Sequence, residues 1–453
     1  MVSLGCAKNL VDSEVMLGHL TREGYEITSD AASADTVIVN TCGFIGEARE
    51  ESIEAILEMT ELKKRGGPSQ VLVAGCMVNK HGAELAESLP EVDGFVDLDG
   101  LASVDRVIQL GSEQGSDLEV SASQAIFDHT SPRVLTSATS AYLKVAEGCD
   151  NPCTFCAIPQ WRGRFRSRSI DSLVAEANQL EQQGIQELCL VAQDTTRYGE
   201  DLGLGRGGLS QLVEALLEQT TVPWIRFLYA YPSTLDLGLL ELMAREERFC
   251  NYLDIPLQHA DRRALRRMKR AGSASRYLDL VRHARERVPN IWLRTTFIAG
   301  FPGETEEEFD HLASFVEQAR FDHMGVFQYS PEEGTSSAEL PNRVPQLVAK
   351  RRAQHLMEIQ RPISLERRTG LVEKGIEVLV EGVCEETELL LQGRHQGLAP
   401  GIDGRVLIND GFARAGDLVK VVITEAHADD VVGHIVVTEA QASANQETEL
   451  VSG

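Results

Sequence analysis

The chain has 453 residues, of which 43% are hydrophobic and 25% charged, a composition that excludes a collagen-like or wholly disordered protein. Lys and Arg number 43 against 69 Asp and Glu, a formal net charge of −26, so the chain as a whole is not attracted to nucleic acid. The length predicts about three domains. No apolar run reaches the roughly 18–20 residues that span a bilayer, and no signal-peptide pattern follows Met1, so we expect a cytoplasmic protein without a membrane partner.

The N-terminal third predicts a parallel α/β sheet. Val37–Val39 and Val71–Val73 are apolar runs of buried-strand length, and Glu47–Lys64 between them has helix-like apolar spacing. Two strands joined by a helix are typical of a parallel sheet, here in a domain over residues 1–125. The stretch 111–140 is rich in Ser, Gly and Thr and is interpreted as a linker.

Residues 135–366 predict a partial (βα) barrel, because six strand candidates alternate with helix candidates such as Ile170–Gln183 and Glu304–Gln318. In such a barrel the chemistry lies at the carboxyl ends of the strands. The strand candidates are Tyr142–Ala146, Glu187–Val191, Ile225–Tyr229, Tyr252–Ile255, Ile291–Phe297 and His323–Gln328.

Residues 369–440 predict a small β-barrel, because short strand candidates are punctuated by Gly and Asp. These candidates are Glu377–Glu381, Glu388–Gln392, Gly404–Ile408, Leu418–Ile423 and Gly433–Val437. The polar tail 441–453 is expected to be disordered.

Charge is distributed unevenly. Residues 370–440 carry 5 basic and 13 acidic side chains, whereas residues 141–369 carry 29 and 31. The cations of the middle block gather in Arg162–Arg168, Arg262–Arg270 and Lys350–Arg352. We expect most of them to be solvated, although they leave contact with RNA open.

One cysteine group lies within a single loop. Cys149, Cys153 and Cys156 form a C-x3-C-x2-C run directly after a strand candidate. Three close thiolates can hold three irons of a 4Fe–4S cluster and leave the fourth iron open to a substrate. A structural zinc ion is less well suited, because it takes four protein ligands and no fourth lies nearby.

A second cysteine group is spread along the N-terminal domain. Cys6, Cys42 and Cys76 each follow an apolar strand candidate, with spacings of 36 and 34 residues. The carboxyl ends of parallel strands meet at one edge, so the pattern predicts a second 4Fe–4S cluster there. The alternative is three buried apolar thiols, the expectation for Cys189.

The C-x3-C-x2-C run after the first barrel strand resembles the radical S-adenosylmethionine (SAM) superfamily. The resemblance implies that the open iron chelates SAM and that one electron splits SAM to an adenosyl radical. Phe155 would then cover the cluster. Four polar residues of barrel strands or their ends are weaker candidates for SAM contact, namely Gln193, Asp194, Arg294 and Thr296.

Two cysteine groups with a terminal β-barrel resemble the methylthiotransferase branch of that superfamily, whose C-terminal barrel is called TRAM. Matching stretches are Val2–Glu14, Glu147–Asn151, Ile255–His259, Phe301–Thr305, Gly393–His395 and Ile402–Gly404. The first stretch resembles the members that modify the β-carbon of an aspartate in small-subunit ribosomal protein twelve. Such a reaction implies that ribosomal protein, an electron donor and a sulfur source as partners.

Two features depart from the family pattern. Ala7 stands where the family usually has Pro, and only five residues precede Cys6. The family has a fuller first strand, so we expect either a start site placed too far downstream or a shortened strand.

Two other functions stay open on the sequence alone. A tRNA methylthiotransferase would share both clusters and the terminal barrel, but an RNA-binding barrel should be basic or aromatic, and Phe412 is the one aromatic residue in 370–440. An acidic barrel suits a basic ribosomal protein. A non-catalytic Fe–S carrier or scaffold would need neither SAM nor an open iron.

Overall fold

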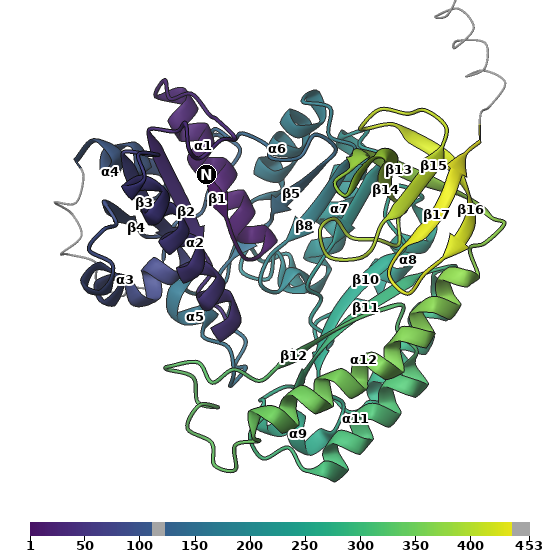
Figure 1. Cartoon of the computed structure of the whole chain (residues 1–453). Coiled ribbons are helices and arrows are strands. Elements are labelled where there is room, and N and C mark those ends of the chain that lie inside the picture. The colour runs from purple at the N-terminus through teal and green to yellow at the C-terminus, as the bar shows by residue number, and fades with distance from the viewer. Residues whose placement is uncertain (111–122, 437–453) are drawn as a thin grey trace, which may run out of the picture.

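The structure is a computed structural model that describes residues 1–110 and 123–436. An N-terminal parallel sheet has the strand order β1-β2-β3-β4 and carries helices on both faces (Figure 1). Its elements are β1 (Val2–Ser3), α1 (Ala7–Arg22), β2 (Thr36–Thr41), α2 (Gly46–Lys64), β3 (Gln70–Gly75), α3 (Cys76–Ser88), β4 (Gly94–Val96) and α4 (Val104–Leu110). The apolar strands β2 and β3 are buried along nearly their whole length, as expected for a covered parallel sheet. The predicted parallel sheet is confirmed, and β1 is short.

Six parallel strands form an open, partial barrel in two groups, β5-β8-β9 and β10-β11-β12. The groups meet where Ala230 N donates a hydrogen bond of 2.9 Å to Asp254 O. The strands are β5 (Ser140–Lys144), β8 (Glu187–Val191), β9 (Trp224–Phe227), β10 (Tyr252–Gln258), β11 (Trp292–Ala299) and β12 (His323–Gln328). The outer helices are α6 (Ile170–Gln182), α7 (Gly208–Gln219), α8 (Gly238–Arg245), α9 (Arg262–Arg267), α10 (Ala274–Arg287) and α11 (Glu306–Ala319). The predicted partial barrel is confirmed.

The part of the expected linker that the structure describes is packed. Arg133 joins two domains, since it pairs with Glu14 of α1 at 2.6 Å and with Glu176 of α6 at 2.8 Å. A side chain at Gly18 of α1 would overlap the backbone of Pro132. This segment therefore fixes the sheet domain against the barrel.

A closed five-stranded barrel in the order β13-β14-β15-β17-β16 follows the long helix α12 (Gln346–Thr369). Its strands are β13 (Gly375–Cys384), β14 (Thr387–Arg394), β15 (Val406–Asp410), β16 (Leu418–Ala426) and β17 (Val431–Ile435). The predicted small barrel is confirmed, whereas Val437 and the tail 441–453 lie outside the described residues.

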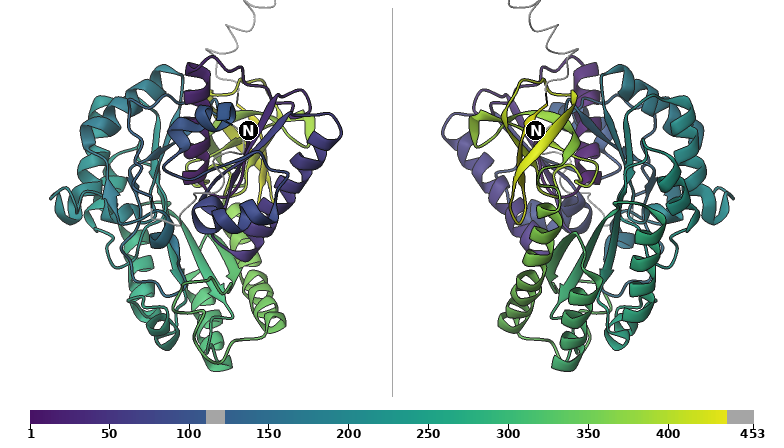
Figure 2. Two further views of the ribbon diagram at one scale, coloured as in Figure 1. Left: turned by 90° about the vertical axis from the view of Figure 1, so that its left-hand side faces the viewer. Right: turned by 90° about the vertical axis from the view of Figure 1, so that its right-hand side faces the viewer.

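The small barrel closes the amino end of the large one (Figures 1 and 2). Contacts fall on the first residues of the large-barrel strands: Glu187 pairs with Arg394 at 2.5 Å, and His323 Nε2 lies 2.8 Å from Gly397 O. The Trp292 ring lies 4.8 Å from the His395 ring. The small barrel therefore does not cover the carboxyl ends of the strands, where the cysteine groups lie.

In residues 1–110 and 123–436, no helix combines the length and the apolar character needed to cross a membrane.

Candidate active site between two cysteine triads

The sheet triad, defined as Cys6, Cys42 and Cys76, lies at the carboxyl edge of the N-terminal sheet. Cys6 is the N-cap of α1, Cys42 follows β2, and Cys76 follows β3 as the first residue of α3. The preceding strands are parallel neighbours. Gly5, with a φ of +90°, lies against the second thiol, since a Cβ there would come within 3.0 Å of Cys42 Sγ. The predicted convergence of these thiols is therefore present.

Charges next to the sheet triad act on its thiols. Burial raises the pKa of Cys42 to about 12 and also raises that of Cys76. For Cys6 burial acts in the same direction, but the cations Lys8 and Arg162 outweigh it and lower the pKa below its usual value. Arg162 Nη2 donates to Cys76 Sγ at 3.1 Å. Cations beside the thiols favour the thiolate form, which binds metal.

The barrel triad, defined as Cys149, Cys153 and Cys156, lies in the loop between β6 (Ala146–Glu147) and α5 (Ile158–Trp161). Gly148 opens the loop with a φ of +75°, and a side chain there would overlap the carbonyl of Arg164. Asn151 N donates to Cys149 Sγ at 3.4 Å. Burial raises the pKa of Cys149 to about 11 and that of Cys156 to about 12.

The donor chemistry of both triads fits iron–sulfur clusters. All nine cysteines are free, and thiolates are the usual ligands of such clusters. In the part of the chain that the structure describes, no three His, Cys, Asp or Glu side chains are arranged so that they could hold a single metal ion. A cluster differs from an ion because each thiolate binds its own iron. Cys189 and Cys250 are fully buried in the barrel.

A buried ion network joins the two triads. Arg162, which touches Cys76, also pairs with Asp12 of α1 at 2.8 Å and with Glu147 at 3.0 Å. Lys144 pairs with the same two carboxylates, at 2.5 and 3.0 Å. Glu147 Oε1 accepts a hydrogen bond of 3.1 Å from Gly148 N, next to Cys149. The network therefore fixes the two cysteine groups relative to each other.

Two arginines of the Arg162–Arg168 cluster, which was expected to be solvated, are instead buried. Arg162 is 2% and Arg168 6% exposed, and Arg168 pairs with Glu176 at 2.6 Å. Neither can reach RNA, so the expectation that the Arg162–Arg168 cluster leaves such contact open is wrong for these two residues. Sequence alone could not identify their partners, which come from other elements.

Three of the candidate SAM-contacting residues lie beside the barrel triad. Gln193 Nε2 donates to Glu147 Oε1 at 2.9 Å, while its buried Oε1 has no hydrogen-bond partner among the described residues. Asp194 accepts a hydrogen bond of 2.7 Å from Asn151, and burial raises its pKa. Phe155 packs edge-on against Phe301 with ring centroids 6.5 Å apart.

Arg294 and Thr296 lie elsewhere on β11, toward the small barrel. Arg294 pairs with Asp254 at 3.4 Å and with Asp403 at 3.3 Å. Its Nη1 also donates to Thr296 Oγ1 at 3.2 Å. Among the described residues, neither side chain forms a hydrogen bond or ion pair with a cysteine of either triad, so both are bound into the seam between the two barrels.

Sequence reasoning missed Arg270, which lies against the barrel triad. It is 8% exposed, and its Nη1 lies 3.7 Å from Cys153 Sγ. Its guanidinium lies over the Tyr231 ring at 4.1 Å, and its buried Nε has no hydrogen-bond partner in the part of the chain that the structure describes. The sequence placed Arg270 in a run of surface cations, with no signal that separated it from its neighbours.

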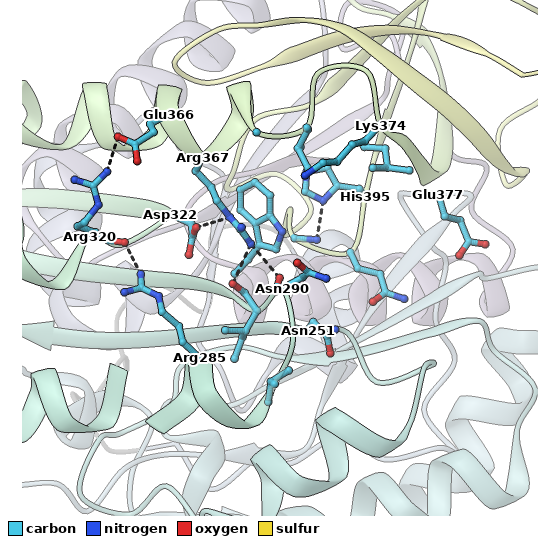
Figure 3. A pocket seen from close by; sticks show the side chains of 18 of the residues that line it. Asn251, Arg285, Asn290, Arg320, Asp322, Glu366, Arg367, Lys374, Glu377 and His395 are labelled. Atoms are coloured by element: carbon cyan, nitrogen blue, oxygen red, sulfur yellow. Dashed lines mark hydrogen bonds and ion pairs between the residues drawn. The ribbon is translucent and has the colours of Figure 1, made fainter. Parts of the chain in front are cut away.

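A cleft of about 810 Å³ opens away from the triads, between the large barrel, the end of α12 and the small barrel (Figure 3). Arg367 crosses it, pairs with Asp322 at 2.8 Å and lies over the Trp292 ring. No cysteine of either triad lines this cleft.

Comparisons with known proteins agree with this architecture. The chain matches the uncharacterized protein family UPF0004 over residues 1–97, the radical SAM superfamily over 143–316 and the TRAM domain over 372–436. Its fold is similar to the radical SAM methyltransferase TsrM of Kitasatospora setae, with a TM-score of 0.51 and 16% identity, covering 72% of this chain and 74% of that one.

The chain is 48% identical over 437 residues to the ribosomal protein uS12 methylthiotransferase RimO of Myxococcus xanthus, covering 96% of this chain and 91% of that protein. It is 47% identical over 441 residues to RimO of Syntrophotalea carbinolica, covering 96% of each. The chain therefore belongs to the RimO family of radical SAM methylthiotransferases.

Proposed function

We propose that this protein adds a methylthio group to the β-carbon of an aspartate in ribosomal protein uS12. One [4Fe–4S] cluster would be held by the barrel triad and a second by the sheet triad. The observation that carries the proposal is the pair of triads, each at the carboxyl end of parallel strands and linked by the buried Arg162–Glu147 network. The substrate comes from the relatives, which are named for uS12.

Each domain has a part in the proposed reaction. When bound, SAM and the clusters supply three things: the radical that removes a hydrogen atom, the sulfur atom, and the methyl group. In the barrel, Gln193, Asp194 and Arg270 would orient SAM, and Phe155 would shield the cluster from water. Arg294 and Thr296 are weaker candidates because they are bound at the seam. Three domains, over residues 1–125, 135–366 and 369–440, would each contribute to this reaction.

The surface of the small barrel supports a basic protein substrate rather than tRNA. Glu385, Glu386 and Glu388 are exposed on the β13–β14 hairpin, beside Leu389, which is 88% exposed. Arg394, one of the few cations of this barrel, is buried against Glu187. An acidic, partly apolar surface complements a basic ribosomal protein and repels a phosphate backbone.

The remaining partners follow from the chemistry. The reaction needs an electron donor and a sulfur source, and ribosomes lie in the cytoplasm, where we place the enzyme. A non-catalytic carrier would have no use for the polar groups around the barrel triad.

The test is an anaerobic assay. The protein, reconstituted with iron and sulfide, receives SAM, a reductant and either uS12 or unmodified tRNA, and mass spectrometry follows the added methylthio group. We expect the gain on an aspartate of uS12 and its loss in Cys149→Ala and Cys42→Ala. Cys189→Ala, a buried cysteine outside both triads, is the matched control. A gain on tRNA alone would assign the enzyme to the tRNA branch.

A further inference from the structure

Among the described residues, Lys8 is a buried cation that pairs with no carboxylate. It is the second residue of α1, two positions after Cys6, and is 8% exposed. Its ammonium lies 3.6 Å from the centroid of the Tyr229 ring. Among residues 1–110 and 123–436, no carboxylate lies within 4 Å of Lys8 Nζ, and no acceptor takes a hydrogen bond from it.

The acids near Lys8 are already neutralised. Asp12, one turn further along α1, pairs with Lys144 at 2.5 Å and with Arg162 at 2.8 Å. The partly buried Lys80, which also lies over an aromatic ring, pairs with Glu332 at 3.0 Å. A buried charge is costly unless it is paired, so the exception at Lys8 points to an anion supplied by a ligand.

The position of Lys8 indicates which ligand. Tyr229 follows β9 in the large barrel, and Tyr231, two residues later, lies under Arg270 beside Cys153. Lys8 therefore spans from the sheet triad to a barrel segment that reaches the barrel triad. A side chain that must meet both triads would pass this ammonium.

We propose that Lys8 binds the carboxylate of the substrate aspartate and so makes the enzyme specific for an acidic side chain. The inference rests on the proposed function and adds to it the residue that recognises the reacting side chain. The β-carbon is bonded directly to the carboxylate carbon, so an ammonium that holds the carboxylate also fixes the carbon. The Tyr229 ring steadies the ammonium by a cation–π contact, which leaves its N–H groups free to donate.

Selectivity follows from burial. An asparagine in place of the aspartate would leave Lys8 buried and unpaired, and such mismatches are rejected strongly. A competing role for Lys8 is to offset the charge of a cluster on the sheet triad. That role predicts a change in the cluster itself and none in the preference between the two side chains.

The experiment compares binding of two peptides to the reconstituted full-length protein with SAM, under anaerobic conditions. One peptide spans the aspartate of uS12 that is modified, and the other carries Asn in its place. The variants are Lys8→Met, which keeps the length of the side chain, and the control Lys80→Met. Iron and sulfide content and SAM cleavage without peptide verify that each variant is folded and loaded.

We expect the wild-type protein to bind the Asp peptide at least about tenfold more tightly than the Asn peptide. Lys8→Met should lose that preference through weaker binding of the Asp peptide, and Lys80→Met should keep it. An unchanged preference in Lys8→Met would overturn the inference, above all if the reduction potential of the sheet-triad cluster shifted instead. Binding of neither peptide by the wild type would refute the proposed function, and the inference with it.

Discussion

The two triads reach the same kind of site by different routes. The barrel triad is local, because three cysteines within eight residues share one loop. The sheet triad is assembled from distant segments and exists when β1, β2 and β3 are in register. The local site needs a tight turn, whereas the assembled site needs a folded sheet. Damage to the sheet should therefore remove one cluster and spare the other.

The largest expected effect comes from removing one ligand of each triad. Cys42→Ala should lose about half of the bound iron and all product, yet still cleave SAM, because the barrel triad is intact. Cys149→Ala should lose SAM cleavage as well. Iron analysis and electron paramagnetic resonance of the reduced proteins measure the clusters, and the amount of 5′-deoxyadenosine measures SAM cleavage. Loss of both clusters in Cys42→Ala would break the separation between the triads.

Arg162→Met should damage both triads together. It leaves Asp12 and Glu147 with Lys144 as their shared cation, and breaking a buried ion network typically costs about 3–5 kcal/mol of unfolding free energy. Arg164→Met is the control from the same loop, since its side chain is 89% exposed. Denaturant unfolding gives the comparison, and equal stability of the two variants would count against a structural role for the network.

The amino end of the large barrel provides a reference away from both triads. Burial alone would raise the pKa of Glu187, but Arg226 and Arg394 outweigh it and lower the pKa to about 2. A depressed pKa stabilises the fold above the ordinary value of about 4.5 and loses that contribution as pH falls toward about 2. We expect Glu187→Gln to flatten the acid limb of the unfolding free energy, at iron content equal to that of the wild type. An unchanged acid limb would contradict this role.

Two glycines with the same backbone conformation test the sheet edge. Gly5 and Gly24 have φ of +90° and +91°, but a Cβ at Gly5 would lie 2.7 Å from Cys42 Cβ, while Gly24 faces open space. Both Ala variants carry the same backbone strain, of about 1–3 kcal/mol. Gly5→Ala should in addition lower occupancy of the sheet triad. Equal iron content in both variants would mean that the carboxyl edge of the sheet accommodates the added Cβ at position 5.

The smallest effect is expected at the exposed acids of the small barrel. Glu385→Gln with Glu388→Gln should weaken uS12 binding a few-fold, more at low salt, with both clusters retained. Glu218→Gln with Glu286→Gln, two exposed acids on large-barrel helices, is the charge-matched control. Binding titrations with uS12 at two salt concentrations measure this difference. Equal losses of affinity in both pairs of variants would indicate a general charge effect.

The sequence predicted what short-range pattern determines. Strands β8 and β12 have the predicted bounds, because apolar runs and turn residues mark them. The convergence of the sheet triad also followed from pattern, since parallel strands end at one edge. Arg162 could not be separated from the basic cluster around it, because Asp12 lies 150 positions earlier in the chain. Arg294 was proposed near SAM from its strand alone, and its partner Asp403 belongs to another domain.

The coupling of SAM cleavage to methylthio transfer shows whether the reaction needs both triads. Wild-type, Cys42→Ala and Cys149→Ala proteins are incubated anaerobically with SAM, reductant and uS12, and 5′-deoxyadenosine and modified uS12 are measured in one sample. We expect both products in the wild type, deoxyadenosine alone in Cys42→Ala and neither in Cys149→Ala. Methylthiolated uS12 from Cys42→Ala would contradict this expectation, because the sheet triad would then be dispensable.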